Sequence, residues 1–390
     1  MTEKFDPVEI AQQLIRCPSV TPEEGGALTY LETLLKDAGF VTHRIIFEDE
    51  RSYPVDNLYA RYGTEAPHFC YAGHTDVVPI GDLADWSHGP FEAEIVDGML
   101  YGRGAVDMKG SIACFAAAAL NFLKSNPDFG GSISFLITGD EEADAINGTI
   151  KLAEWVKERG ETIDACIVGE PTNVEKIGDG IKLGRRGSLS GSLIVEGIQG
   201  HVAYQHKAHN PIPHILPALQ SLIDPPLDGG TEHFEPSNLE ITSVDVGNLA
   251  KNNIPARVKA LFNVRFNDSW TVETLETELK RRVADAMGTY SDYRLEFVRP
   301  VSENFVTSAP ELIKPLVESI KNVTGLDAEL STGGGTSDAR FMKNYCPVVE
   351  FGMLSDTIHQ VDERTSVEDL KSVTAIFHEF LKLYFTKQTA

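Results

Sequence analysis

Acids and histidines directly follow two apolar runs of this sequence. "HFCYAG" runs into His74 and Asp76, and "SISFLIT" runs into Asp140, Glu141 and Glu142. A charged cluster after a strand usually marks only a solvated turn. The same side chains can also bind a divalent metal ion or act as general bases. The choice between these interpretations depends on where the other acids and histidines fall.

Three further segments carry residues of the same kind. Glu170 follows "DACIVG", His359 follows "CPVVEFG" after a short loop, and Asp107 in "YGRGAVD" precedes an apolar helix. Open α/β sheets bind ligands at the carboxyl ends of their strands, so five segments are expected to meet at one edge. Two histidines and several carboxylates without cysteine suit catalytic zinc, cobalt or manganese. We therefore predict a metal site, against the alternative of an ordinary polar sheet edge.

The spacing of these residues suggests roles for some of them. Residues i and i+2 of an extended chain share a face, so Asp76 can accept the second ring N–H of His74. Glu141 and Glu142 are adjacent and point apart, so one can reach a metal while the other acts as general base on a metal-bound water. Asp140 is expected to be a structural acid that binds backbone amides in the turn.

The elements that must position these residues alternate between helix and strand. "PVEIAQQLIR" and "GALTYLETLLKDAG" predict amphipathic helices, and strands are expected near 40–47, 55–62 and 67–73. A nearly all-apolar helix follows Lys109. Apolar runs without clean alternation indicate strands covered on both faces. The fold class predicted is therefore α/β, with a mostly parallel sheet covered by helices.

From Gly187 the order of predicted elements becomes βαββαβ, which is typical of a ferredoxin-like unit able to fold as an insertion. The sequence therefore predicts one discontinuous catalytic, metal-binding domain, residues 1–185 and 299–390. The inserted domain is expected to span residues 186–298.

Composition limits the classes of partner. The 390 residues carry a formal net charge of -24, so nucleic acid and anionic membranes are not expected as partners. The amino terminus has no signal-peptide pattern and no apolar run is long enough to span a membrane, so a cytoplasmic location is expected. The five cysteines are scattered without a C-x-x-C pair and are expected to be reduced and buried.

Five stretches occur in the order and spacing of one known family: "YAGHTDVVPIGD", "GMLYGRGAVDMKG", "ITGDEEADAINGT", "IVGEPT" and "IHQVDE". Over nearly its whole length the chain resembles the two-metal aminoacylase and glutamate-carboxypeptidase-like hydrolases. Gly139 and Gln205 depart from the family pattern, but neither is a proposed ligand.

The resemblance implies two divalent metal ions, zinc or else cobalt. One would be held by His74, Asp107 and Glu170, and the other by Asp107, Glu142 and His359. It also implies Glu141 as general base and Asp76 as the partner of His74. Two dications with three carboxylates leave a charge of about +1, which favours a bridging hydroxide at neutral pH and polarises an amide carbonyl.

In this family the inserted domain is a dimerisation lid, so the resemblance implies a homodimer. It implies that His201 of "GIQGHVAY" reaches into the partner's active site and stabilises the oxyanion. His206, His209 and His214 have no such match. The substrate contacts implied for an anionic small molecule are Arg185, Ser188, Asn253, Arg265 and Thr336. Arg186 is equally available from sequence.

Three stretches resemble the branch of the family that removes succinate from N-succinyl-diaminopimelate in bacterial lysine and cell-wall precursor synthesis: "IKLGRRGSLSGSLIVEGIQGHVAY", "NNIPARVKALFNVRF" and "GGGTSDARF". The branch that deacetylates acetylornithine, or another that hydrolyses N-acyl amino acids, would use the same metal site and stays an alternative. A metal-binding dimer without catalysis is a third possibility, but it would require a missing ligand or base.

Overall fold

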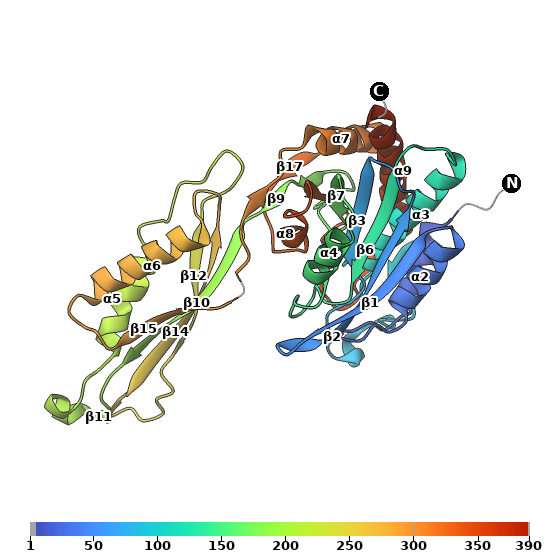
Figure 1. The fold of residues 1–390 in the computed structure, drawn as a ribbon. Coiled ribbons are helices and arrows are strands. Elements are labelled where there is room, and N and C mark those ends of the chain that lie inside the picture. Colours follow the sequence, from blue (N-terminus) through green and yellow to red (C-terminus); the bar gives the residue numbers. More distant parts are fainter. Residues whose placement is uncertain (1–4, 300, 389–390) are drawn as a thin grey trace. The chain divides into compact units, whose positions relative to one another are not determined.

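The computed structural model describes residues 5–299 and 301–388, which form two compact units (Figure 1). Unit 1 contains the described chain up to Gly184, Thr307–Ser331, and the described chain from Ser337 onward. Unit 2 contains Arg185–Val306 and Thr332–Thr336. The insertion predicted at residues 186–298 lies inside unit 2.

An eight-stranded sheet forms the centre of unit 1, in the order β1-β2-β6-β3-β7-β18-β8-β17. Its strands are β1 (Val41–Asp49), β2 (Ser52–Tyr62), β3 (His68–His74), β6 (Ser132–Thr138), β7 (Ala165–Val168), β8 (Gly180–Lys182), β17 (Glu329–Ser331) and β18 (Val348–Glu350). β3 pairs in parallel with β6 and β7, and β7 pairs in parallel with β18. The carboxyl ends of these four strands therefore share one edge, while the pairs β1–β2 and β2–β6 are antiparallel. The predicted α/β class is confirmed.

Helices cover both faces of this sheet. One hydrophobic core contains residues from α1 (Pro7–Ile15), α2 (Ala27–Asp37), α3 (Lys109–Ser125), α7 (Pro310–Thr324) and α9 (Val367–Gln388). Phe69 and Tyr71 of β3 belong to this core, whereas the alternate residues Cys70 and Ala72 do not. The other face packs against α4 (Thr149–Glu158), which contacts β6 and α8 (Ala339–Met342). Burial on both faces explains why the strands read as continuous apolar runs.

Unit 1 also contains a three-stranded sheet, and two of its strands flank the loops that carry candidate ligands. It consists of β4 (Ile95–Val96), β5 (Met99–Tyr101) and β19 (Arg364–Ser366), with β5 between the other two. A short 3-10 helix, η1 (Leu83–Asp85), lies earlier in the chain. The chain from β5 to α3 and the chain into β19 are therefore held side by side.

Unit 2 is an antiparallel sheet with two helices. The sheet has the order β12-β14-β10-β15, with β10 (Gly187–Glu196), β12 (Asn238–Asp245), β14 (Arg257–Phe266) and β15 (Tyr293–Phe297). Alternate residues of β14 pack in one core with α5 (Ile212–Ile223) and α6 (Val272–Met287). The predicted βαββαβ order is confirmed. The remaining short elements are β9 (Gly184–Arg185), β11 (Gly200–His201), η2 (Val202–Lys207), β13 (Asn253–Ile254) and β16 (Phe305–Val306).

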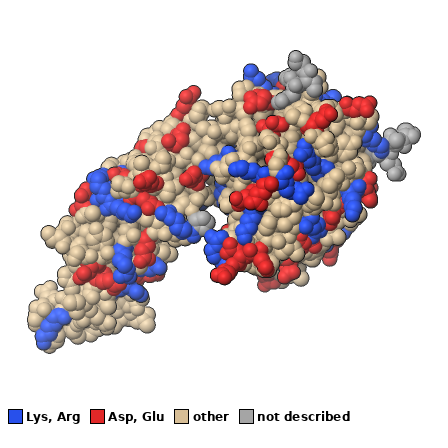
Figure 2. All heavy atoms as spheres, viewed as in Figure 1, with Lys and Arg blue, Asp and Glu red and all other residues tan. Residues whose placement is uncertain are grey.

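Four of the five cysteines are buried as predicted, and Cys17 is partly exposed. On the face drawn in Figure 2, basic and acidic side chains are interspersed over both units. In residues 5–299 and 301–388, no helix has the length and apolar character needed to cross a membrane.

Candidate metal centre

The predicted ligands meet at the carboxyl edge of the parallel strands of unit 1. His74 is the last residue of β3, while Glu142 and Glu170 follow β6 and β7 within four residues. Asp107 lies in the loop between β5 and α3, and His359 lies in the loop between β18 and β19. Their ligand atoms form two groups, and within each group all atoms lie within 4.8 Å of one another. The groups are His74–Asp107–Glu170 and Asp107–Glu142–His359.

Asp107 is shared by the two groups through its two carboxylate oxygens. Oδ1 lies 3.2 Å from Nε2 of His74, and Oδ2 lies 3.2 Å from Nε2 of His359. Glu170 Oε1 is 3.7 Å from the His74 ring, and Glu142 Oε1 is 3.0 Å from the His359 ring. One carboxylate facing two groups of ligand atoms can bridge two cations.

The donor set fits divalent metal ions. Glu170 Oε1 is buried without a hydrogen-bond partner among the described residues. Within the same part of the chain, no lysine or arginine forms an ion pair with Asp107, Glu142 or Glu170. Buried carboxylates without a cation are costly. Nitrogen and oxygen donors without thiolate suit zinc or cobalt.

The pKa values in the metal-free chain reflect this crowding of acids. Burial opposes the charged form of His74, but hydrogen bonds with Asp107 and Asp76 hold its pKa well above the ordinary value. Hydrogen bonds with Asp107 and Glu142 raise the pKa of His359 to about 10. Burial, together with the charge of Asp107, raises the pKa of Glu170 well above its usual range. Protons thus occupy groups that a dication would deprotonate on binding.

The backbone of the centre is constrained at two positions, His359 and Gly169. Non-glycine His359 has φ 59°, a conformation that costs energy and clusters at functional sites. The turn before Glu170 contains Gly169, where an added Cβ would lie 1.8 Å from the hydroxyl oxygen of Tyr71. A side chain at this position would push the Glu170 turn away from the sheet.

Glu141 is not in either ligand group, although Glu142 beside it is. The backbone N–H groups of Glu141 and Glu142 donate to the two carboxylate oxygens of Asp76, at 3.2 and 3.1 Å. Burial raises the pKa of Glu141 to about 8 against the opposing charge of His74, and Asp338 and Glu142 add to the rise. A carboxylate with this pKa can accept and return a proton near neutral pH.

Asp76 is the partner of His74, and the closer of its two acceptors is the main-chain carbonyl. The ring Nδ1 of His74 lies 2.9 Å from the main-chain carbonyl of Asp76 and 3.5 Å from its Oδ1. The carboxylate also accepts hydrogen bonds from the Glu141 and Glu142 amides and from the hydroxyl of Thr21, which donates at 2.8 Å. No feature of the sequence pointed to Thr21.

Asp140 is a structural acid, as predicted. Its Oδ2 accepts hydrogen bonds from the backbone N–H groups of Ile146 at 2.9 Å and Asn147 at 3.0 Å. The hydroxyl of Tyr53 donates to Oδ1 at 2.7 Å. Both oxygens are therefore used to close the turn after β6.

The predicted substrate residues lie in unit 2, and several gather at one end of its sheet. Ser188 of β10 stands directly opposite Arg265 of β14. Nearby Arg186 lowers the pKa of Arg265, after burial as the larger cause. Arg185 donates to the carbonyl of Gly333, in the loop of unit 2 that ends at Thr336. These cations and hydroxyls can bind carboxylates.

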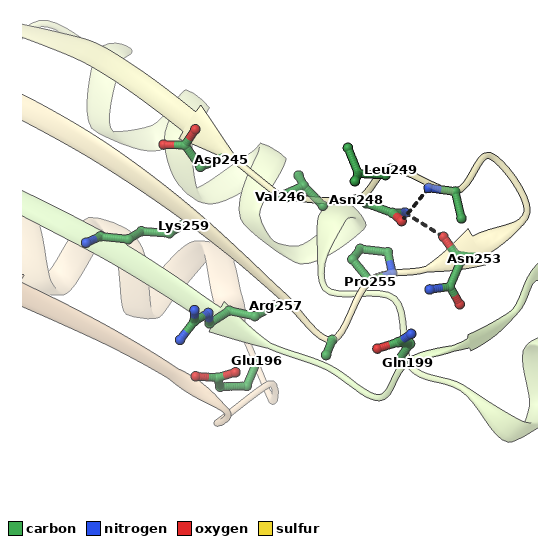
Figure 3. A pocket seen from close by; sticks show the side chains of 13 residues that line it. Glu196, Gln199, Asp245, Val246, Asn248, Leu249, Asn253, Pro255, Arg257 and Lys259 are labelled. Atoms are coloured by element: carbon green, nitrogen blue, oxygen red, sulfur yellow. Dashed lines mark hydrogen bonds between the residues drawn. The ribbon is translucent and has the colours of Figure 1, made fainter.

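His201 and Asn253 lie together at the other end of unit 2, opposite each other in the β11–β13 pair. The N–H of Ala203 donates to Nδ1 of His201, and Nδ2 of Asn252 lies 3.3 Å from Nε2. Asn253 lines a cavity of about 800 Å³, and so does Leu249 in the loop that precedes Asn253 (Figure 3). Nδ2 of Asn248 donates to the Asn253 carbonyl across that loop, at 2.7 Å.

The class of protein follows from comparison with known families. The sequence profile of Peptidase family M20/M25/M40 matches residues 70–383. The chain therefore belongs to this family. Among solved structures it is similar to an M20 family metallo-carboxypeptidase from Sulfolobus solfataricus, with TM-score 0.77 and 18% identity, over 97% of this chain and 99% of that one. It is also similar to a dinuclear metal binding M20 peptidase of Bacillus subtilis, with TM-score 0.70 and 15% identity, over 98% of each chain.

A curated relative is much more similar in sequence. The chain is 57% identical over 388 residues to the succinyl-diaminopimelate desuccinylase of Rhodopseudomonas palustris (strain BisB5). The match covers 99% of this chain and 100% of that protein.

Proposed function

We propose that this protein hydrolyses N-succinyl-LL-2,6-diaminopimelate to succinate and LL-2,6-diaminopimelate, a step of lysine and diaminopimelate biosynthesis. The observation that carries the proposal is the pair of ligand groups sharing Asp107, with Glu141 beside them. The 57% identity to a desuccinylase over nearly the whole chain supports this choice of substrate. A cytoplasmic location belongs to the same proposal, because free cysteines are typical of a reducing compartment.

The proposed cofactors are two divalent ions, zinc in preference to cobalt. His74, Asp107 and Glu170 would hold one ion, and Asp107, Glu142 and His359 the other. When bound, such ions polarise the scissile carbonyl and lower the pKa of water.

Glu141 is the proposed general base. Its carboxylate takes a proton from the attacking water, whose oxygen forms a bond to the succinyl carbonyl carbon. As the C–N bond breaks, the same carboxylate returns the proton to the leaving amine. Burial raises the pKa of Glu141 in the metal-free chain to about 8, and the charge of bound dications would lower it again, which frees the carboxylate to accept a proton. Asp76 fixes the backbone from which Glu141 and Glu142 diverge.

A homodimer is the proposed assembly, and the geometry of unit 2 supports it. Ser188 and Arg265 stand at one end of the β10–β14 pair, and Glu196 and Arg257 mark the other end, about 26 Å away. His201 follows beyond that second end. The proposed substrate is only about as long as four extended residues, roughly 14 Å. If Arg265 and His201 contact one substrate molecule, they must come from different copies of the chain.

Unit 2 exposes apolar side chains near His201, where the proposed second copy of the chain would bind. The side chains of Val202 and Tyr204 are about half exposed, and Leu249 is fully exposed. Apolar side chains grouped in this way commonly mark interfaces. In this proposal the imidazole of His201 stabilises the oxyanion of a substrate bound in the other copy.

The test is hydrolysis of N-succinyl-LL-2,6-diaminopimelate and of acetylornithine by the same preparation, with and without chelator. We expect the succinyl substrate to have much the higher kcat/KM, and chelator to abolish its hydrolysis. Equal or better turnover of acetylornithine would reject the proposed substrate. Full activity after verified removal of metal would reject the proposed mechanism.

A further inference from the structure

A buried ion pair between Arg103 and Glu363 lies beside the candidate metal centre without supplying any of its ligand atoms. Arg103 is 2% exposed and Glu363 is fully enclosed, and Nη1 lies 2.8 Å from Oε2. Desolvating two charges offsets much of their attraction, so a buried pair is weak evidence for stability alone. The contacts of the two side chains indicate another role.

Glu363 holds the loop of the bridging residue. One carboxylate oxygen accepts the backbone N–H of Gly104 at 3.0 Å. The other accepts the N–H groups of Val106 at 2.9 Å and Asp107 at 3.1 Å. Charge-assisted hydrogen bonds of this kind are stronger than neutral ones. One side chain therefore fixes the backbone that presents Asp107.

Arg103 holds the loop of the other ligand. Its Nη1 donates to the carbonyl of Gln360 at 3.1 Å, and Nη2 lies 3.5 Å from the carbonyl oxygen of His359. Glu363 itself is only four residues beyond His359 and leads into β19. Each partner of the pair thus belongs to one ligand loop and binds the backbone of the other.

We infer that Arg103 and Glu363 are positioning residues, which hold Asp107 and His359 at the separation that the Asp107–Glu142–His359 group requires. The inference rests on the proposed metal centre. The other two ligands, His74 and Glu170, are presented by the ends of β3 and β7. Asp107 belongs to both groups, so loss of Glu363 weakens metal binding at both, whereas loss of the Arg103 contacts with Gln360 and His359 weakens chiefly the group that contains His359.

The test is calorimetric titration of the metal-free, full-length protein with Co²⁺. The wild type should show two binding events. Glu363→Gln, which removes the charge and replaces one acceptor oxygen by a donor, should lower the affinity of both events, by about 10- to 100-fold, because both use Asp107. In a His359→Ala background, where one event is lost, adding Glu363→Gln should still weaken the remaining event, because that event also uses Asp107.

Glu161→Gln is the matched control, because it removes the acid of another ion pair of unit 1. Glu161 Oε2 lies 2.8 Å from Arg61 Nη1, and neither residue contacts a candidate ligand. This variant should bind both ions as the wild type does. If circular dichroism shows that Glu363→Gln does not fold, Arg103→Lys provides the test of the positioning role. The lysine keeps the charge but cannot contact both Glu363 and Gln360. Arg103→Lys should weaken chiefly one event, the one that is lost in His359→Ala.

Two failures are distinguishable. Fewer than two events in the wild type would overturn the proposed metal centre and the inference with it. Two events in the wild type that are unchanged in both variants, or equally weakened in Arg103→Lys, would overturn the positioning role alone.

Discussion

Asp140, Glu141 and Glu142 are three consecutive acids with three different environments. Both oxygens of Asp140 accept hydrogen bonds that close the turn. Glu142 lies 3.0 Å from the His359 ring, inside a ligand group, while Glu141 lies outside both groups. The role of each carboxylate follows from its contacts, so Glu141 and Glu142 should respond differently to the same substitution.

Glu141→Gln should retain both metal ions and lose turnover by about 10²- to 10⁴-fold, because the amide cannot accept the proton of water. Glu142→Gln is the paired control and should lose metal at the His359 group. Metal content by atomic emission and kcat with the succinyl substrate separate the two effects. Unchanged kcat in Glu141→Gln would contradict its role as base.

At the scale of the element, the sheet strands could be predicted and the contacts between loops could not. The patterns near 55–62 and 67–73 predicted β2 and β3, and the apolar run in β3 fits a strand that is buried at every residue. The i, i+2 spacing predicted Asp76 as the partner of His74. It did not predict that the carbonyl would be the closer acceptor, because that depends on how Glu141 and Glu142 occupy the carboxylate.

Glu363 was missed although it lies in the quoted stretch "IHQVDE". Its partners Arg103 and Asp107 are 260 and 256 residues away in the sequence. Such contacts form only when β5 and β19 pair. A local pattern can therefore identify a ligand by its place after a strand, but not the distant side chain that holds the loop.

The buried ring of His68 in strand β3 predicts that the stability of the protein depends on pH. Burial, with the charge of Arg61, lowers the pKa of His68 to about 4, and the ring is hydrogen-bonded to Ser134. In the unfolded chain its pKa is about 6.5, so below that pH the unfolded state binds the extra proton. Stability is therefore fully present above about pH 6.5 and is lost as the pH falls toward 4, by on the order of 3 kcal/mol from this residue.

Urea unfolding of the metal-free protein between pH 7.5 and 4.5 measures this loss. His68→Gln should be less stable than wild type at pH 7.5 and show a shallower decline with acid. His43→Gln, in the edge strand β1, is the control and should decline as steeply as wild type. Equal slopes for His68→Gln and wild type would show that His68 is not the titrating group.

At the scale of the whole molecule, the central question is which copy of the chain supplies His201. The two ends of the unit 2 sheet lie about 26 Å apart by strand length, against roughly 14 Å for the proposed substrate, which favours a contribution from the partner copy. If His201 acts in the partner's site, defects in Glu141 and His201 must complement each other in a mixed dimer. One of its two sites would then contain neither defect.

Coexpressed Glu141→Gln and His201→Ala chains should recover about a quarter of wild-type activity, because random pairing makes half of the dimers mixed. Each variant alone should be nearly inactive. The control is a mixture of Glu141→Gln with His206→Ala/Glu141→Gln, in which every site lacks the base. No recovery in the first mixture, with mixed dimers verified by differential tags, would place His201 in its own chain's site or outside catalysis.

The two-metal centre is tested most directly by anomalous diffraction at the zinc edge from crystals of the zinc-loaded protein. We predict two peaks about 3.5–4 Å apart, one among His74, Asp107 and Glu170 and one among Asp107, Glu142 and His359. Asp107 should contact both. A single peak at full zinc loading, or two peaks that do not share Asp107, would contradict the account.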